Sequence, residues 1–215
     1  SPTPPVDRLD TAWRYLALGF THILPLGFDH ILFLLALLLP AVLWRENGRW
    51  RPAMALRTVL LETAGIVTAF TLAHSLTLSL AVLGVVNLPS RLVETVIAFT
   101  IVLAALNNLF PLVTTRRWLL AFGLGLIHGF GFASVLWELG LPRDALALAL
   151  ASFNLGVEAG QLTIVAMVLP LAFALRQTWL YRRLALPVGS AAVALLALIW
   201  CLERGLNINV FSNPT

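Results

Sequence analysis

The residues best suited to chemistry in this chain are its four histidines, each of which lies beside a run of apolar residues. His22 and His30 flank a break in the segment THILPLGFDHILFLLALL, His74 lies in FTLAHSLTL, and His128 lies in GLIHGFGFA. Neutral imidazole binds divalent ions such as Zn, Ni, Co and Cu(II). Ionisable groups in hydrocarbon cost at least about 2.5 kcal/mol, so they are rare and usually face a cavity or one another. These histidines therefore predict at least one metal or proton site.

Carboxylates and amides extend this candidate set. Asp29 directly precedes His30, and Asn154, Glu158 and Gln161 have i, i+4, i+7 spacing, which places them on one face of a helix. A single membrane histidine is commonly just an interhelical hydrogen-bond partner, whereas four beside other polar groups favour a site. The predicted metal ligands are His22, Asp29, His30, His74, Glu94, His128 and Glu158, supported by Thr71, Asn154 and Gln161.

The composition is that of an integral membrane protein. Of the 215 residues, 60% are hydrophobic and only 11% are charged, whereas about a quarter are charged in soluble domains. All 14 basic residues are arginines between apolar runs, a pattern that sets membrane orientation and does not indicate nucleic acid. The single cysteine, Cys201, excludes an intramolecular disulfide and a CxxC motif. The expected surroundings are a lipid bilayer, and the oligomeric state is left open.

The apolar runs predict an all-α fold, a polytopic bundle of about six membrane helices that forms a single domain over residues 1–215. A segment over 10–24 is too short and too polar to span, so it is expected to be an interfacial or re-entrant helix that ends at Pro25. Residues 1–9 are expected to be flexible and 204–215 to form a tail. The predicted spans within the bundle (27–203) are 27–44, 56–83, 90–110, 118–138, 146–174 and 184–203.

The arginines predict the orientation of the bundle. The first, third and fifth loops between spans hold nine arginines and the opposite side holds five. Because the arginine-rich side is normally cytoplasmic, both termini are expected outside the inner (cytoplasmic) membrane of a bacterium. An exported N-terminus agrees with removal of a signal peptide before Ser1, although a trimmed chain would begin in the same way.

This topology arranges the candidate ligands as a ladder of increasing depth at about 1.5 Å per residue. The predicted order from the outer mouth to the midplane is Asp29 with His30 and Glu94, then His74, then His128 and Glu158. Glycine pairs let helices approach closely. Gly125 and Gly129 bracket His128, and Gly156 and Gly160 bracket Glu158, so the fourth and fifth spans are predicted to pack against each other.

Five sequence blocks, in order, resemble the HupE/UreJ family, particularly its second branch. They are GFTHILPLGFDHILFLLALLL, TAFTLAHSLTLSLAVLG, LVETVIAFTIVLAALNN, FGLGLIHGFGFASVL and FNLGVEAGQL, within roughly residues 12 to 165. The resemblance implies a small polytopic nickel or cobalt permease associated with hydrogenase and urease systems. It also implies that the functional residues are His22, Asp29, His30, His74 and His128.

Three functions remain open, and we favour a permease for a divalent ion (Ni, Co or Zn) over an enzyme. The first alternative is an intramembrane zinc-dependent hydrolase in which His30, His74 and His128 bind the metal and Asp29 or Glu94 acts as base. Ser75, beside His74, could contact an intermediate in such an enzyme, although neither HExxH nor GxSxG is present. The second alternative is a non-catalytic assembly partner of a metalloprotein system.

Overall fold

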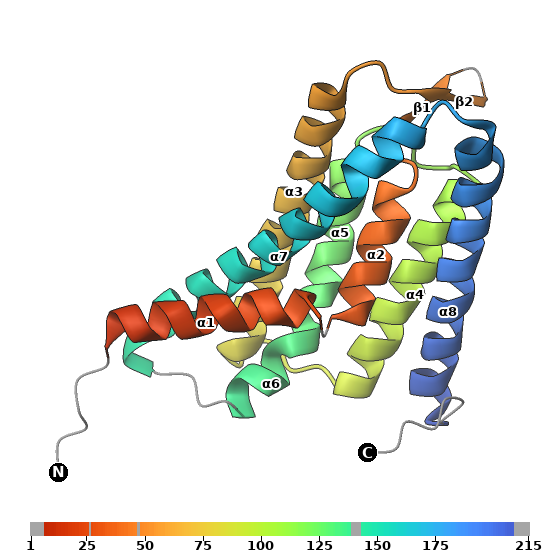
Figure 1. Ribbon diagram of the computed structural model, residues 1–215. Coiled ribbons are helices and arrows are strands. Elements are labelled where there is room, and N and C mark those ends of the chain that lie inside the picture. The colour runs from red at the N-terminus through yellow and green to blue at the C-terminus, as the bar shows by residue number, and fades with distance from the viewer. Residues whose placement is uncertain (1–6, 26, 47, 139–142, 209–215) are drawn as a thin grey trace, which may run out of the picture.

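The computed structural model describes residues 7–25, 27–46, 48–138 and 143–208, which form a helical bundle with one short hairpin (Figure 1). The predicted all-α membrane bundle is therefore confirmed. The elements are α1 (Arg8–Ile23), α2 (Phe28–Leu38), β1 (Leu43–Glu46), β2 (Arg49–Pro52), α3 (Leu56–Val82), α4 (Ser90–Leu109), α5 (Arg117–His128), η1 (Gly129–Phe132), α6 (Ala133–Glu138), η2 (Arg143–Ala145), α7 (Leu146–Leu175), η3 (Tyr181–Ala185) and α8 (Leu186–Leu206).

Four helical segments are long and apolar enough to cross a membrane: α3, α4, α7 and the continuous segment Tyr181–Leu206. They coincide with four of the predicted spans. The α1 and α2 helices, which are bent by 64° relative to each other, are together long and apolar enough to cross a membrane. Arg117–Phe132 is a shorter apolar helix. The chain is an integral membrane protein, and α1 with α2 has the form of a broken span or a re-entrant loop.

The first predicted span is too long, and the fourth is interrupted by a 3₁₀ segment before α6 continues to Glu138. The first ends as a helix at Leu38, after which the chain turns at Pro40 and pairs β1 with β2 in an antiparallel hairpin. Proline removes a helical hydrogen bond, and Gly48 supplies the positive φ of 77° that the turn needs. The fourth ends as an α-helix at His128, where a 3₁₀ segment, Gly129–Phe132, replaces it.

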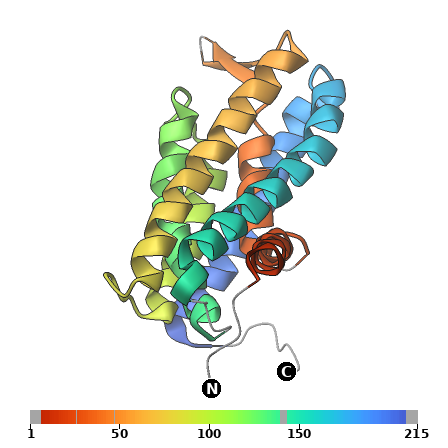
Figure 2. The same ribbon diagram turned by 90° about the vertical axis from the view of Figure 1, so that its left-hand side faces the viewer.

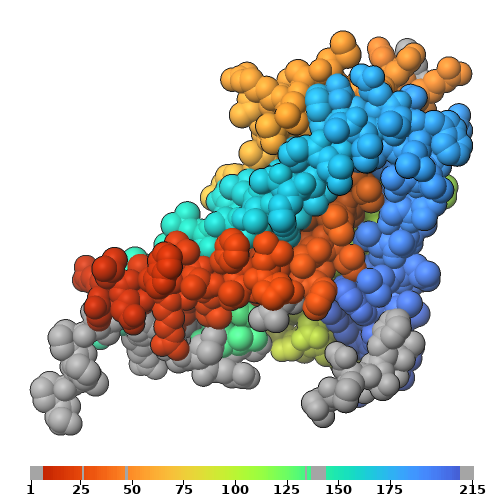
Figure 3. Space-filling view, viewed as in Figure 1, coloured from red at the N-terminus to blue at the C-terminus, as the bar shows by residue number. Residues whose placement is uncertain are grey.

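Helix α1 begins earlier than predicted and lies across α7. Asp7 caps it by accepting a hydrogen bond from the backbone N–H of Leu9 at 2.9 Å, so part of the segment predicted to be flexible is helical. Residues 1–6 and 209–215 lie outside the described residues. In Figure 2 α1 is seen along its axis beside α7, and Figure 3 shows the two helices side by side on one face of the molecule.

The crossing of α1 and α7 is a contact between backbones. A Cβ added at Gly19 would overlap the carbonyl oxygen of Phe153, and one added at Gly156 would overlap the carbonyl oxygen of Leu16. Each glycine thus faces the main chain of the other helix. This crossing places His22, one turn after Gly19, over the side of the bundle.

The predicted packing of the fourth span against the fifth is wrong. Gly125 and Gly129 face the carbonyl oxygens of Phe70 and His74, so α5 packs on α3. The glycines of α7 face α1 instead. The small residues were identified correctly as close-packing positions, but their partners depend on the rotation of each helix, which the spacing of glycines does not determine.

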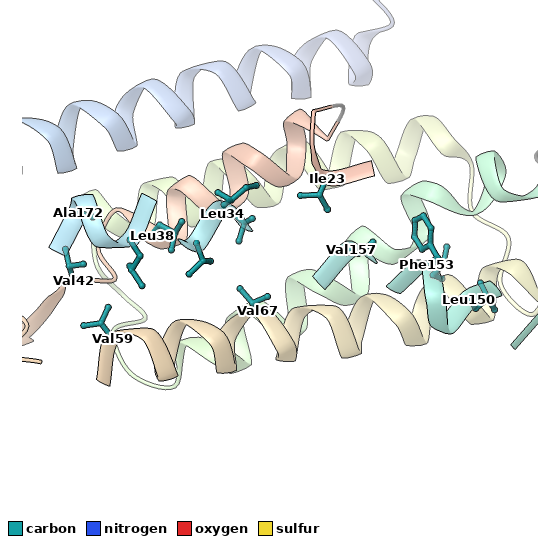
Figure 4. Packing of buried hydrophobic residues seen from close by; sticks show 14 of the residues in the cluster. Ile23, Leu34, Leu38, Val42, Val59, Val67, Leu150, Phe153, Val157 and Ala172 are labelled. Atoms are coloured by element: carbon teal, nitrogen blue, oxygen red, sulfur yellow. The ribbon is translucent and has the colours of Figure 1, made fainter. Parts of the chain in front are cut away.

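Apolar side chains hold this arrangement on both sides of the histidines. Figure 4 shows part of the larger cluster, in which Ile23 of α1, Leu38 of α2, Val67 of α3 and Val157 of α7 point toward a common centre. A second cluster joins α2, α3, α4, α5 and α8 around buried residues that include Phe33. Burial of such side chains fixes the positions of the helix segments that carry the polar residues.

We expect Gly156→Ala to destabilise the protein by about 1–3 kcal/mol, because the new methyl group overlaps the backbone of α1. The matched control is Gly123→Ala in α5, where an added Cβ meets nothing within 4 Å and alanine favours the helix. The free energy of unfolding in mixed micelles measures both changes. Equal stabilities for the two variants would contradict the backbone contact.

Candidate metal centre

Three histidines from three helices meet where α1 breaks before α2. His22 lies at the end of α1, His30 at the start of α2, and His74 in the second half of α3. The ring centroid of His22 lies 4.8 Å from that of His30 and 6.5 Å from that of His74, and the last two rings are 6.0 Å apart. One ligand nitrogen of each ring lies within 4.8 Å of the others. Together these three residues form the histidine triad.

Each residue of the histidine triad has a buried Nε2 atom with no hydrogen-bond partner among the described residues. A buried polar atom without a partner costs about 1–3 kcal/mol, and such atoms are few in folded proteins. Aromatic rings exclude other partners here, since Phe132 lies 4.0 Å and Phe153 lies 5.7 Å from His22 between centroids. A single cation bound between the rings would satisfy all three nitrogens.

The hydrogen bonds of His74 determine its tautomer. Asn154 directs its amide Nδ2 to the carbonyl of Leu150 at 2.8 Å, which leaves its Oδ1 as an acceptor 3.2 Å from His74 Nδ1. Nδ1 of His74 must therefore carry the proton and donate it. Its Nε2 then presents a lone pair toward the histidine triad. Such a hydrogen bond to the far ring nitrogen is the usual way in which proteins orient a metal-binding histidine.

His128 lies beside the histidine triad, with its ring centroid 5.3 Å from that of His30. Thr100 donates its hydroxyl proton to the carbonyl of Ile97 at 2.6 Å, so its oxygen is left to accept from His128 Nε2 at 3.0 Å. His128 thus carries its proton on Nε2, and its buried Nδ1 has a lone pair without a partner. It lies outside the group of three histidines whose ligand nitrogens are within 4.8 Å of one another.

A cavity of about 590 Å³ opens onto this cluster from the end of the bundle where α1 meets α2. His22, His30 and His128 line it, together with Asp29 and Glu94, whereas His74 lies behind them. Glu94 is exposed and His74 is fully buried. The cavity therefore gives access to the histidine triad from this end of the bundle.

Asp29 is held in an ion pair at the wall of this cavity. Arg204, near the end of α8, donates from Nη1 and Nη2 to the two carboxylate oxygens at 3.2 and 3.0 Å. The same guanidinium also donates to the backbone carbonyl of Glu94 at 3.3 Å. The guanidinium of Arg204 thus lines the cavity and forms an ion pair with Asp29, which the sequence predicted to be a metal ligand.

Further polar groups form a row between α3 and α7, which we call the α3–α7 row. Thr71 donates to Gln161 Oε1 at 3.2 Å, and Thr68 donates to Glu158 Oε1 at 2.6 Å. Because Thr68 lies two turns before His74 on α3, the row leads away from the histidine triad toward the opposite end of the bundle. Ser75 is not part of it, since its hydroxyl bonds the carbonyl of Thr71 at 2.6 Å.

The predicted ladder of histidines is wrong in its spacing. The ring centroid of His30 lies 4.8, 6.0 and 5.3 Å from those of His22, His74 and His128, whereas Glu158 bonds Thr68, which precedes His74 on α3. The hydrolase alternative predicted that His30, His74 and His128 would bind the metal. In the structure His22, rather than His128, joins His30 and His74 in the group of three. Sequence reasoning missed Thr100 and Arg204, although a threonine inside the apolar run AFTIVL and an arginine after a long apolar helix were visible signals.

These features define a class: a helical integral membrane protein in which buried imidazoles converge beside a cavity. The comparison with protein families agrees, since the model described as HupE / UreJ protein matches residues 5–204. The chain therefore belongs to the HupE/UreJ family. A search of curated proteins and a search of solved structures found no match.

We expect nitrogen NMR of histidine-labelled protein to find neutral His74 protonated on Nδ1 and His128 protonated on Nε2, because Asn154 and Thr100 accept from those atoms. Asn154→Leu should change the signals of His74 and leave those of His128 unchanged, and Thr100→Val should do the reverse. Identical tautomers for the two rings would contradict this hydrogen-bond assignment.

Proposed function

We propose that this protein is a permease for a divalent transition-metal ion that binds between His22, His30 and His74. The observation that carries the proposal is the convergence of three histidines, each of which offers one ring nitrogen within 4.8 Å of those of the others. Each also has a buried Nε2 atom without a hydrogen-bond partner among the described residues. The histidine triad offers only neutral imidazole, which suits Ni, Co, Zn or Cu(II) and disfavours Mg or Ca.

The geometry of the histidine triad is compatible with such an ion. Nitrogen atoms bound to one tetrahedral ion lie about 3.4 Å apart, since each metal–nitrogen bond is about 2.1 Å long. The spacing of the ligand nitrogens, within 4.8 Å, requires only adjustment of side-chain rotamers. The open side of the cavity supplies a position for water or for the nitrogen of His128.

Transport needs a route beyond the binding site, and the α3–α7 row supports one. Along α7 it runs from Asn154 beside His74 to Glu158, the single carboxylate in the sequence of α7, and then to the buried Gln161. The bond from the exposed Thr68 to Glu158 lies at the outer edge of this row. A partly dehydrated cation leaving the imidazoles would meet oxygen ligands along this row. The ion would thus pass from the cavity, through the histidine triad, toward the arginine-rich end of the bundle.

We expect His30→Ala to reduce uptake of Ni²⁺ or Co²⁺ into proteoliposomes at least about tenfold, because a ligand to the ion is lost. Glu158→Gln should slow uptake and leave equilibrium binding at the histidine triad unchanged. Asp10→Asn is the matched control, because Asp10 is an exposed carboxylate of α1 that does not line the cavity. Uptake by His30→Ala equal to that of the unaltered protein would overturn the permease.

A zinc-dependent hydrolase is the second candidate, and one observation favours it. Three imidazoles with an open side facing a cavity, which also contains the carboxylate of Glu94, resemble a catalytic zinc site with its base. The enzyme would retain zinc through dialysis, hydrolyse a substrate, and tolerate Glu158→Gln. Metal binding with neither uptake nor turnover would instead favour an assembly partner.

We expect Arg204→Gln to accelerate binding of a divalent cation severalfold at low salt, because it removes a positive charge from the cavity wall and releases Asp29. The control is Arg14→Gln, an exposed arginine of α1 that does not line the cavity. Stopped-flow absorbance of Co²⁺ measures the rate. Equal acceleration by both variants would indicate a nonspecific effect of net charge.

A further inference from the structure

We propose that a second cavity, at the arginine-rich end of the bundle, binds one anionic phospholipid. Its volume is about 510 Å³, and it lies between the turn that leads into β1, the helix α3, and the segment that leads into α5. In Figure 1 this end carries the β1–β2 hairpin, away from the break between α1 and α2. The proposal is independent of the metal centre.

The rim of this cavity is basic. Arg45, Arg116 and Arg117 line it with the hydroxyl-bearing residues Thr114 and Thr115. Arg117 is partly buried and donates to the carbonyl of Pro40 at 3.3 Å, whereas Arg45 and Arg116 are exposed. Among the described residues neither exposed arginine forms an ion pair with a carboxylate.

One carboxylate in the cavity partly offsets this charge. Glu62 lines the wall and interacts electrostatically with Arg117. Three guanidinium groups against one carboxylate leave an excess of two positive charges, which favours an anionic group at the rim. Phosphate oxygens are suitable partners for arginine because the planar guanidinium can donate two parallel hydrogen bonds.

The inner wall of the cavity is formed by small and apolar residues of α3. Gly65 and Ala69 lie one turn apart on α3, with Ile66 beside them. A Cβ added at Gly65 would meet nothing within 4 Å, so this glycine is not required by contact with another helix. Glycine weakens a helix interior by about 1 kcal/mol relative to alanine, so an open hollow above it indicates space for an occupant.

The combination of walls and rim favours a phospholipid over other anions. An acyl chain would lie along Gly65 and Ala69, and the headgroup phosphate would face Arg45 and Arg116. Trp44 and Trp118, which are 41% and 49% exposed, flank the cavity as aromatic residues do at the level of lipid headgroups. Basic pockets between membrane helices are a known chemical environment for anionic headgroups. A free phosphate would use only the rim.

The test is native mass spectrometry of the full chain released from micelles that contain cardiolipin or phosphatidylglycerol. Gly65→Leu should abolish the bound anionic lipid and leave the protein folded, because its side chain fills open space. Gly123→Leu is the matched control, since Gly123 is also an exposed helical glycine with nothing within 4 Å of an added Cβ. Equal lipid retention by the two variants would overturn the proposal.

The charge of the rim is tested separately. The double variant Arg45→Ala with Arg116→Ala should weaken binding about thirtyfold, given the usual contribution of each arginine near an anionic surface. The control removes Arg182 and Arg183, which lie outside the cavity and carry the same total charge. Equal losses in both variants, equal binding of phosphatidylcholine, or displacement of the lipid by inorganic phosphate would each overturn the phospholipid assignment. Retention of a copurified acidic peptide in place of lipid would do the same.

Discussion

Contact between the backbones of α1 and α7 is the constraint on which the candidate site depends. At Gly19 and Gly156 the two main chains touch, so α1 lies across α7 at a fixed distance and in a fixed rotation. His22 follows Gly19 by three residues and therefore points toward α3 rather than toward lipid. Without this crossing, His30 and His74 would form a pair, and the third nitrogen of the histidine triad would be missing.

Hydrogen bonds then decide which nitrogen of each ring is free. Asn154 and Thr100 each have their donor committed to a main-chain carbonyl, so each can only accept from the neighbouring imidazole. This commitment leaves His74 with a lone pair on Nε2 and His128 with one on Nδ1. The main-chain carbonyls of Leu150 and Ile97 thus decide which ring nitrogen of each histidine keeps a lone pair, because they orient the side chains that accept from the other ring nitrogen.

The sequence was sufficient to predict the class of fold, the family and the histidines that lie together. The membrane spans could be predicted from apolar runs longer than 18 residues, from the arginine-bearing loops between them and from the thickness of a bilayer. The depth order of the histidines could not be predicted in the same way. It depends on the bend between α1 and α2 and on the rotation of α3, whereas the prediction assumed straight helices in sequence order. The hairpin β1–β2 was missed because its first residues, Leu43 and Trp44, were included in the first predicted span, 27–44.

The helix partners of the glycines could not be predicted either, because they also depend on the rotation of each helix. Close contacts are made by all four of the glycines Gly125, Gly129, Gly156 and Gly160, yet none of these contacts joins α5 to α7 in the part of the chain that the structure describes. Small residues indicate that another helix backbone packs nearby, and the larger side chains around them determine which helix that is. Phe70 and Phe153 show this, since each lies on the helix that receives a glycine and also encloses a histidine.

Charge balance limits what the proposed ion can do once bound. Three neutral imidazoles leave a divalent cation with its full charge in a site lined by phenylalanine, where an uncompensated ion is costly. Asp29 is nearby but already neutralised by Arg204, and Glu94 is exposed to the cavity. The next carboxylate along the bundle is Glu158, which is half-buried and accepts a hydrogen bond from the exposed Thr68 at the edge of the α3–α7 row. In the proposed permease, an ion that moved along this row would gain a carboxylate as it lost imidazoles, and that exchange would lower the barrier that a purely apolar route would present.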